Sequence, residues 1–201
     1  MMIDDELLVP RELYIDAGVH FGTAKKTSNM EPYIYKTINI GRRQINLIDI
    51  RKTAARIRVA AKFISRYHPN KVLVTSKRRY GHQAIKKFSE IIGSKYITGQ
   101  IKPGTLTNYS SKHYIEADLL IIIDPKKDID AINESSISKI PIICLSNTDN
   151  NFINVDLVIP ANNRGKKALA LIFWILTRQV LLERSEINFF SEFNFPISDF
   201  L

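Results

Sequence analysis

The sequence predicts an α/β fold, a three-layer αβα sandwich with a mostly parallel five-stranded sheet. Apolar segments rich in β-branched residues alternate along the chain with segments of helical period, which is typical of βα units. The most continuously apolar segment, 119–123, needs cover on both faces, as strands of a parallel sheet do. With 201 residues, 45% of them hydrophobic, the chain can bury a core of this size.

An N-terminal β-hairpin is expected to precede the sheet. Segments 33–40 and 44–48 flank Gly41, Arg42 and Arg43, a short connection with a glycine where a hairpin would turn. Both arginines would then stand at an exposed tip. The strands of the main sheet are expected at 71–75, 96–98, 119–123, 142–145 and 157–159.

A helix is predicted over 50–67, with Asp49 as N-cap and Pro69 ending it at His68. At 3.6 residues per turn, its apolar residues lie on one face and its cations on the opposite face. Like charges without acids on the same arc repel one another unless something negative neutralises them, so we favour a phosphate-contacting face over a merely solvated one. The cations are Arg51, Lys52, Arg56, Arg58, Lys62 and Arg66.

The charge of the whole chain is segregated in the same way. Of its 29 lysines and arginines, 19 lie between Lys25 and Lys102, beginning with Lys25 and Lys26, and only three acids share that segment. The flanking segments are acidic. A localised positive region orients a polyanion and releases counterions when phosphates bind, so we expect one face of the protein to contact nucleic acid.

A second basic cluster is predicted where strand 71–75 leads into a helix that ends near Gly93. Lys77, Arg78 and Arg79 would contact phosphate at this carboxyl edge of the sheet, where ligands of α/β proteins commonly bind. Tyr80 beside them could stack on an unpaired base or could be a packing residue.

A polar loop of restricted geometry spans residues 100–108. Lys102, Thr105, Thr107 and Asn108 could hold a phosphate or sugar, as such residues do at nucleic-acid interfaces. The alternative is a turn capped by its own hydroxyl groups.

Catalytic, cofactor and metal sites find little support. The segment before Lys166 lacks the glycine of a phosphate loop, no dinucleotide motif follows a predicted strand, and the four histidines lack metal-ligand spacing. Asp124, at the end of a strand, could serve a nucleotide- or nucleic-acid-processing enzyme, but Pro125 after it favours a turn. We therefore expect no catalytic residue, no metal and no cofactor.

The length of the apolar segments and the number of cysteines indicate where the protein is located. Helix 168–183 is expected to be mostly buried, and its apolar run is too short to cross a bilayer, so no membrane partner is expected. Cys144 is the only cysteine, which excludes an intrachain disulfide and suggests a reducing, cytoplasmic compartment and a buried structural thiol.

Several motifs in order resemble one family, the small-subunit ribosomal proteins of the universal S-two type, in their archaeal and eukaryotic form. The resemblance covers roughly residues 9–187. We interpret residues 1–187 as a single α/β domain that binds ribosomal RNA, and 188–201 as an aromatic C-terminal tail. The short connection after Asn108 points to the archaeal type. The matching segments are 17–23, 47–53, 103–108, 123–125, 140–142 and 159–171.

The resemblance implies a Rossmann-like, flavodoxin-like sandwich that is a non-enzymatic constituent of the small ribosomal subunit. It further implies binding to small-subunit ribosomal RNA, bridging of head and body near the mRNA exit, and neighbouring small-subunit ribosomal proteins as partners, with mRNA near its exit as a further candidate partner. The chain departs from the family pattern at Gln100, Lys139 and Asn147, where Arg, Gly and Asp are common. The aromatic tail is expected to pack on a neighbouring protein or back on this one.

Overall fold

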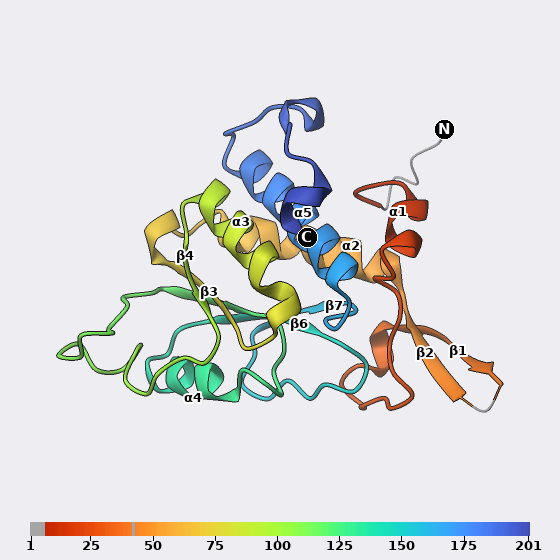
Figure 1. Ribbon diagram of the computed structural model, residues 1–201, viewed down its shortest axis with the longest axis horizontal. Coiled ribbons are helices and arrows are strands. Elements are labelled where there is room, and N and C mark those ends of the chain that lie inside the picture. Colours follow the sequence, from red (N-terminus) through yellow and green to blue (C-terminus); the bar gives the residue numbers. More distant parts are fainter. Residues whose placement is uncertain (1–6, 42) are drawn as a thin grey trace.

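A computed structural model describes residues 7–41 and 43–201 of the chain, without the side chains of Ile40 and Arg43. Its main sheet has five parallel strands in the order β4-β3-β5-β6-β7, so the predicted fold class is confirmed and the sheet is parallel throughout (Figure 1). Each strand lies within two residues of its predicted position. The strands are β3 (Val72–Ser76), β4 (Lys95–Thr98), β5 (Leu119–Ile122), β6 (Ile142–Ser146) and β7 (Leu157–Pro160).

The strand order is that of a flavodoxin-like sheet. Counted from β3, the strands lie in the order second, first, third, fourth, fifth, and the direction of winding reverses between β3 and β5. Val74 of β3 pairs with Tyr96 on one side and with Ile121 on the other. The carboxyl ends of β3 and β5 therefore meet at the point where sheets of this kind usually bind a ligand.

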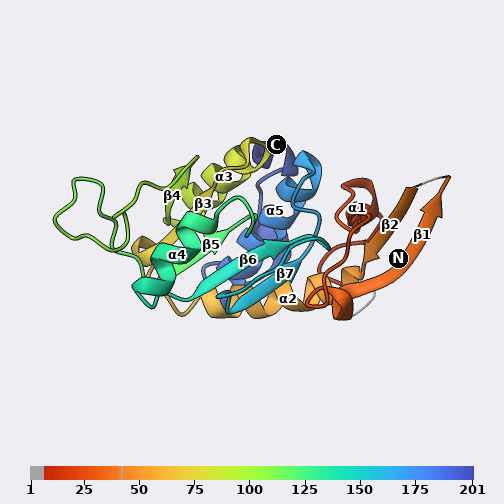
Figure 2. The same ribbon diagram turned by 90° about the horizontal axis from the view of Figure 1, so that it is seen from below.

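Helices cover both faces of the sheet (Figure 2). On one face lie α2 (Ile50–Ile64), α3 (His82–Ile92) and α5 (Lys166–Glu183), and on the other lies α4 (Ile129–Ile137). The side chains of β5 alternate between two cores, because Leu119 and Ile121 pack with α2, α3 and α5, whereas Leu120 and Ile122 pack towards α4. β5 is therefore buried on both faces and contributes side chains to both cores.

The ends of α2 have local causes. The Asp49 carboxylate accepts a hydrogen bond from the backbone N–H of Arg51 at 3.0 Å, which confirms the predicted N-cap. The helix ends at Ile64, three residues earlier than predicted, where the chain tightens and the N–H of Tyr67 bonds to the Ile64 carbonyl. His68 is extended before Pro69, as expected.

The predicted hairpin is present as β1 (Ile34–Ile40) and β2 (Arg43–Ile48). It is fastened to the body by the buried side chain of Asn46, whose amide donates to the carbonyl of Thr23 at 2.7 Å. Gly22 makes this approach possible, because a Cβ there would lie 2.4 Å from the Asn46 carbonyl oxygen. Arg42 and the side chain of Arg43, predicted at the exposed tip, lie outside the described residues.

The aromatic tail packs back on the protein, which is one of the two arrangements expected. Phe193 and Phe200 are buried against the core of α3 and α5, and the indole N–H of Trp174 donates to the Phe195 carbonyl at 2.7 Å. Two short helices, α1 (Arg11–Asp16) and α4, were not predicted from the sequence. Both are too short to display a clear period.

Lys139 is one of the positions where the sequence departs from the family pattern, and the backbone explains why glycine is common there. It follows the end of α4 with φ of 56°, in the left-handed region, and its N–H caps the Ser136 carbonyl. A side chain is strained in this conformation by about 1 kcal/mol.

We predict that Lys139→Gly raises the free energy of unfolding by about 1 kcal/mol, because glycine adopts this conformation without strain. Urea denaturation measures the change. Lys139→Ala is the control, and it should leave stability nearly unchanged since alanine keeps the strained Cβ. An equal gain from both substitutions would show that the lysine charge, not the backbone, is responsible.

Candidate nucleic-acid interface

The crevice at the reversal of strand order is filled by side chains of the protein itself. The guanidinium of Arg78, which follows β3, contacts the Asp124 carboxylate, which follows β5, through Nη2 at 2.5 Å and through Nε at 2.8 Å. Asp124 is only 1% exposed. Its other carboxylate oxygen accepts hydrogen bonds from the backbone N–H of Lys126 and the side chain of Asn150.

A second buried carboxylate, Asp128, completes this network. It accepts hydrogen bonds from the backbone N–H groups of Lys77 at 2.7 Å and of Asp124 at 3.1 Å. Burial raises the pKa of Asp128 to about 6, although these two donors act in the opposite direction. Asp128 was not predicted as a site residue, because an acid four residues after a turn-forming aspartate is not distinctive in sequence.

The network decides between the two interpretations of Asp124. Both carboxylate oxygens bond to groups of the protein, one of them closing the turn to Lys126, so the predicted turn-forming role of Asp124 is confirmed. No cluster of three histidine, cysteine or acidic side chains that could hold a metal ion occurs among residues 7–41 and 43–201. Cys144 is buried, as expected, and burial raises the pKa of its thiol.

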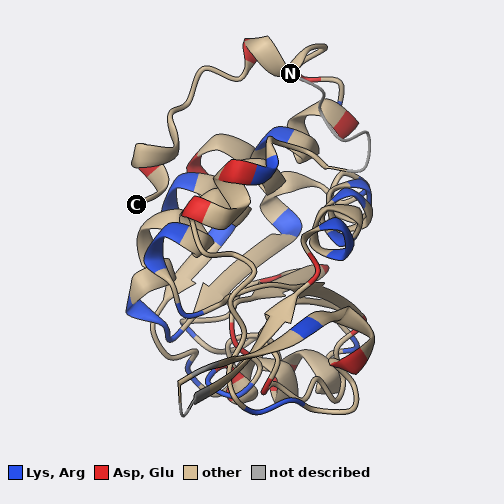
Figure 3. Ribbon diagram, turned by 90° about the vertical axis from the view of Figure 1, so that its right-hand side faces the viewer, with Lys and Arg blue, Asp and Glu red and all other residues tan. Residues whose placement is uncertain are grey.

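The cationic face of α2 is exposed at both ends of the helix and half-buried at Arg56 and Arg58. Figure 3 shows lysine and arginine in blue on this helix, which is seen there nearly end-on. Near its start, Arg51 pairs with Asp49, the Lys52 ammonium donates to the carbonyl of Pro32, and Arg56 donates to the Tyr33 hydroxyl at 2.6 Å. This half of the helix therefore holds the chain that leads into the hairpin.

The end of α2 and the turn after it present their charges to solvent. Lys62, in the last turn of the helix, and Arg66, two residues beyond its end, are exposed, and their side chains form no hydrogen bond or ion pair with any residue that the structure describes. Arg58 is half-buried and lines a pocket beside Val9 and Arg178. Lys62 and Arg66 are thus the cations of this face that are most available to a phosphate.

The corner after β3 divides its four candidate residues into two pairs. Lys77 forms an ion pair with Asp130 at 2.6 Å, and Arg78 belongs to the buried network. Arg79 and Tyr80 are exposed, Tyr80 to 62%. Gln100 also donates to Asp130, at 3.1 Å, so this departure from the family pattern takes part in the same corner.

The polar loop 100–108 and the chain before the hairpin also contain some predicted residues that are engaged within the protein and others that are exposed. Thr105 is buried and its hydroxyl donates to the Lys102 carbonyl at 2.6 Å, which favours the self-capped turn at this position. The predicted residues of these two segments that are exposed are Lys25, Lys26, Lys102, Thr107 and Asn108, with Lys26 paired to Glu31 at 2.8 Å.

The helices of the basic segment are not neighbours in the structure. α2 and α3 lie on opposite sides of α5, within the layer that covers one face of the sheet, and Figures 1 and 2 agree on this arrangement. The basic residues of α2 and those at the corner before α3 are therefore separated by the last helix of the chain. Contact with nucleic acid through one face stays a prediction.

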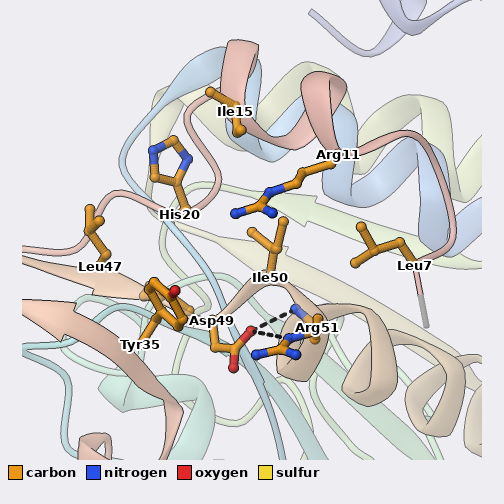
Figure 4. A pocket seen from close by; sticks show the side chains of 10 residues that line it. Leu7, Arg11, Ile15, His20, Tyr35, Leu47, Asp49, Ile50 and Arg51 are labelled. Carbon is orange, nitrogen blue, oxygen red and sulfur yellow. Dashed lines mark hydrogen bonds and ion pairs between the residues drawn. The ribbon is translucent and has the colours of Figure 1, made fainter. Parts of the chain in front are cut away.

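A pocket of about 390 Å³ separates α1 from the hairpin (Figure 4). Its walls carry the guanidinium groups of Arg11 and Arg51 beside the apolar side chains of Ile15 and Ile50. The apolar residues Leu13, Ile15 and Phe21 are exposed near it. Such a mixture of apolar and cationic groups is typical of a surface that binds a macromolecule.

The protein thus combines a flavodoxin-like sheet, whose crevice is occupied by its own side chains, with exposed cations on several elements. The sequence model of the ribosomal protein S2 family matches residues 14–116 and 112–182 of the chain. The small ribosomal subunit protein uS2 of Thermofilum pendens is 46% identical over 199 residues, which cover 99% of this chain and 92% of that protein.

Two further archaeal relatives agree. The uS2 proteins of Staphylothermus marinus and Thermoplasma acidophilum are 48% and 41% identical, and the matches cover 89% and 98% of this chain and 80% and 98% of those proteins. The chain therefore belongs to the ribosomal protein S2 family, and it is a structural ribosomal protein of the archaeal type, not an enzyme. Within the described ranges, no helix combines the length and apolarity that spanning a membrane requires.

The buried Asp128 predicts an unusual dependence of stability on pH. Its pKa is about 6 in the folded protein against an ordinary value of 3.8, so the folded state binds the proton more tightly than the unfolded state does. The cost of burying the charge is present above pH 6 and is relieved as the pH falls.

Relative to Asp128→Asn, the wild type should therefore gain about 2 kcal/mol of stability between about pH 7.5 and pH 4.5. Urea denaturation of both proteins across this range measures the difference, in which the contributions of the other acids cancel. A difference that stays constant with pH would show that Asp128 titrates at an ordinary pH in the folded protein.

Proposed function

We propose that this protein is a structural constituent of the small ribosomal subunit that binds small-subunit ribosomal RNA through its exposed cations. The observation that carries the proposal is the end of α2 and the turn after it, where Lys62 and Arg66 have no partner within the described part of the chain. Exposed cations without an internal partner are available to neutralise phosphates. Membership of the ribosomal protein S2 family supports the same partner.

Further cations extend the proposed contact around the molecule. Lys25, Arg79 and Lys102 are exposed, with Tyr80 beside Arg79. A helical RNA hides its base edges in a deep, narrow groove, so cations spread over several elements suit recognition of backbone and shape. Lys77, Arg78 and Thr105 contribute by fixing the positions of the exposed residues beside them.

Neighbouring proteins of the small subunit are the second class of partner that we propose. The pocket between α1 and the hairpin and the exposed Leu13, Ile15 and Phe21 offer them a partly apolar surface (Figure 4). The resemblance to the family supports a place that bridges head and body near the mRNA exit, where mRNA would also pass. The two kinds of surface, cationic and apolar, suit a protein held between RNA and protein.

The test measures binding to deproteinised archaeal small-subunit ribosomal RNA over a range of salt concentrations. Lys62→Glu/Arg66→Glu should lower affinity at least about tenfold near 0.1 M salt and reduce the salt dependence by about two phosphate contacts. Binding that is equally tight in the double variant would contradict the assignment of α2.

A matched variant controls for the change of net charge. Lys127→Glu/Lys167→Glu reverses two lysines that are exposed but lie outside the basic segment between Lys25 and Lys102. It should bind the RNA nearly as the wild type does, apart from a small long-range effect. Equal losses in the two double variants would mean that net charge alone, and no particular surface, governs binding.

A further inference from the structure

The connection from β4 to β5 forms a projecting loop without a helix. It extends beyond the edge of the sheet next to β4, as Figures 1 and 2 both show. In a βα unit a crossover helix usually occupies this place and covers the sheet. The residues that replace it here are mostly exposed, and Ile101, Leu106 and Ala117 alone among them are buried hydrophobic residues of the core beside α4.

The base of this loop is nevertheless fixed. The Glu134 carboxylate of α4 accepts hydrogen bonds from the backbone N–H groups of Gly104 at 2.5 Å and Leu106 at 2.8 Å. The N–H of Ile115 bonds to the Thr105 carbonyl at 2.8 Å, and Leu106 is buried in the core below α4. The two ends of the projecting part are therefore held together.

At the tip, an exposed aromatic residue is flanked in the sequence by two cations. Tyr109 is 83% exposed, the highest value among the exposed large hydrophobic residues of the described chain. The side-chain oxygen of Asn108 accepts a hydrogen bond from the backbone N–H of Ser110 at 3.0 Å. This bond fixes the turn that carries the Tyr109 ring. Lys102 precedes and Lys112 follows Tyr109 in the sequence, and both are exposed. The Lys102 ammonium lies 3.1 Å from Nε2 of His113 in the same loop, and residues 91–115 contain no acid.

From this arrangement we infer that Tyr109 is a stacking platform for an unpaired nucleobase of single-stranded RNA, with Lys102 and Lys112 holding the flanking phosphates. An exposed aromatic side chain between cations is the combination by which proteins bind single strands, because every base offers a face for stacking. The absence of acids favours RNA over a basic protein segment. This inference rests on the proposed function and specifies a second mode of contact within it.

The test uses a short fluorescein-labelled oligoadenylate and an RNA duplex, with binding followed by fluorescence anisotropy. Tyr109→Ala should lower affinity for oligoadenylate about tenfold, since stacking on one base contributes about 1–3 kcal/mol, and should leave duplex binding unchanged. Tyr109→Phe should bind oligoadenylate as the wild type does, because the ring is retained. Phe189→Ala removes an exposed aromatic side chain outside the basic segment and should change neither affinity.

Three results would overturn the inference. If Tyr109→Ala bound oligoadenylate as tightly as the wild type does, stacking would be excluded. If the same variant then failed to join the small subunit, Tyr109 would contact a protein instead of RNA. Equal losses in Tyr109→Phe and Tyr109→Ala would implicate the hydroxyl group instead of the ring. Equal losses for oligoadenylate and duplex would mean contact with phosphate alone. The Lys62→Glu/Arg66→Glu variant separates these from failure of the proposed function, because its loss of ribosomal RNA does not depend on Tyr109.

Discussion

The guanidinium of Arg78 meets the carboxylate of Asp124 where the strand order of the sheet reverses, and the arrangement of the surrounding loops depends on this contact. Asp124 also binds Asn150, and Asn150 in turn binds Asn163, so loops after β3, β5, β6 and β7 are tied together. Removing one partner of such a buried pair typically costs about 3–5 kcal/mol, because the other charge is left uncompensated. The place where a flavodoxin-like sheet would bind a ligand is therefore occupied by a hydrogen-bond network that connects these loops.

Because the crevice is occupied by the protein's own side chains, the residues that remain available for binding lie on the exterior. The same interactions that fill the crevice hold Lys77 and Arg78 inward and leave Arg79 and Tyr80 outward. On α2, the first cations fasten the hairpin, and the later ones remain exposed. A backbone that is ordered before binding loses little conformational entropy when the protein binds folded RNA, which suits a permanent constituent of a ribonucleoprotein particle.

Much of the fold could be predicted from the sequence because its signals are local. The strand 119–123 is continuously apolar, and the apolar and cationic residues of α2 separate at helical spacing, so both elements and the fold class were predicted. The partners of charged side chains could not be predicted, since they come from distant parts of the chain. Arg178 illustrates this, because it is only 7% exposed and its guanidinium donates to the Leu8 carbonyl at 2.6 Å, 170 residues away in sequence. For the same reason the sequence could not separate Arg78, which is engaged, from Arg79, which is exposed.

We propose that the exposed cations, and not the crevice where the strand order reverses, contact RNA in the small subunit. Acetylation of lysines in the assembled subunit and in the free protein, quantified by mass spectrometry, tests this most directly. We expect Lys62 and Lys102 to be strongly protected by assembly and Lys127, beside the filled crevice, to stay reactive. Protection of Lys127 with full reactivity at Lys62 and Lys102 would contradict the account and place the contact at the crevice.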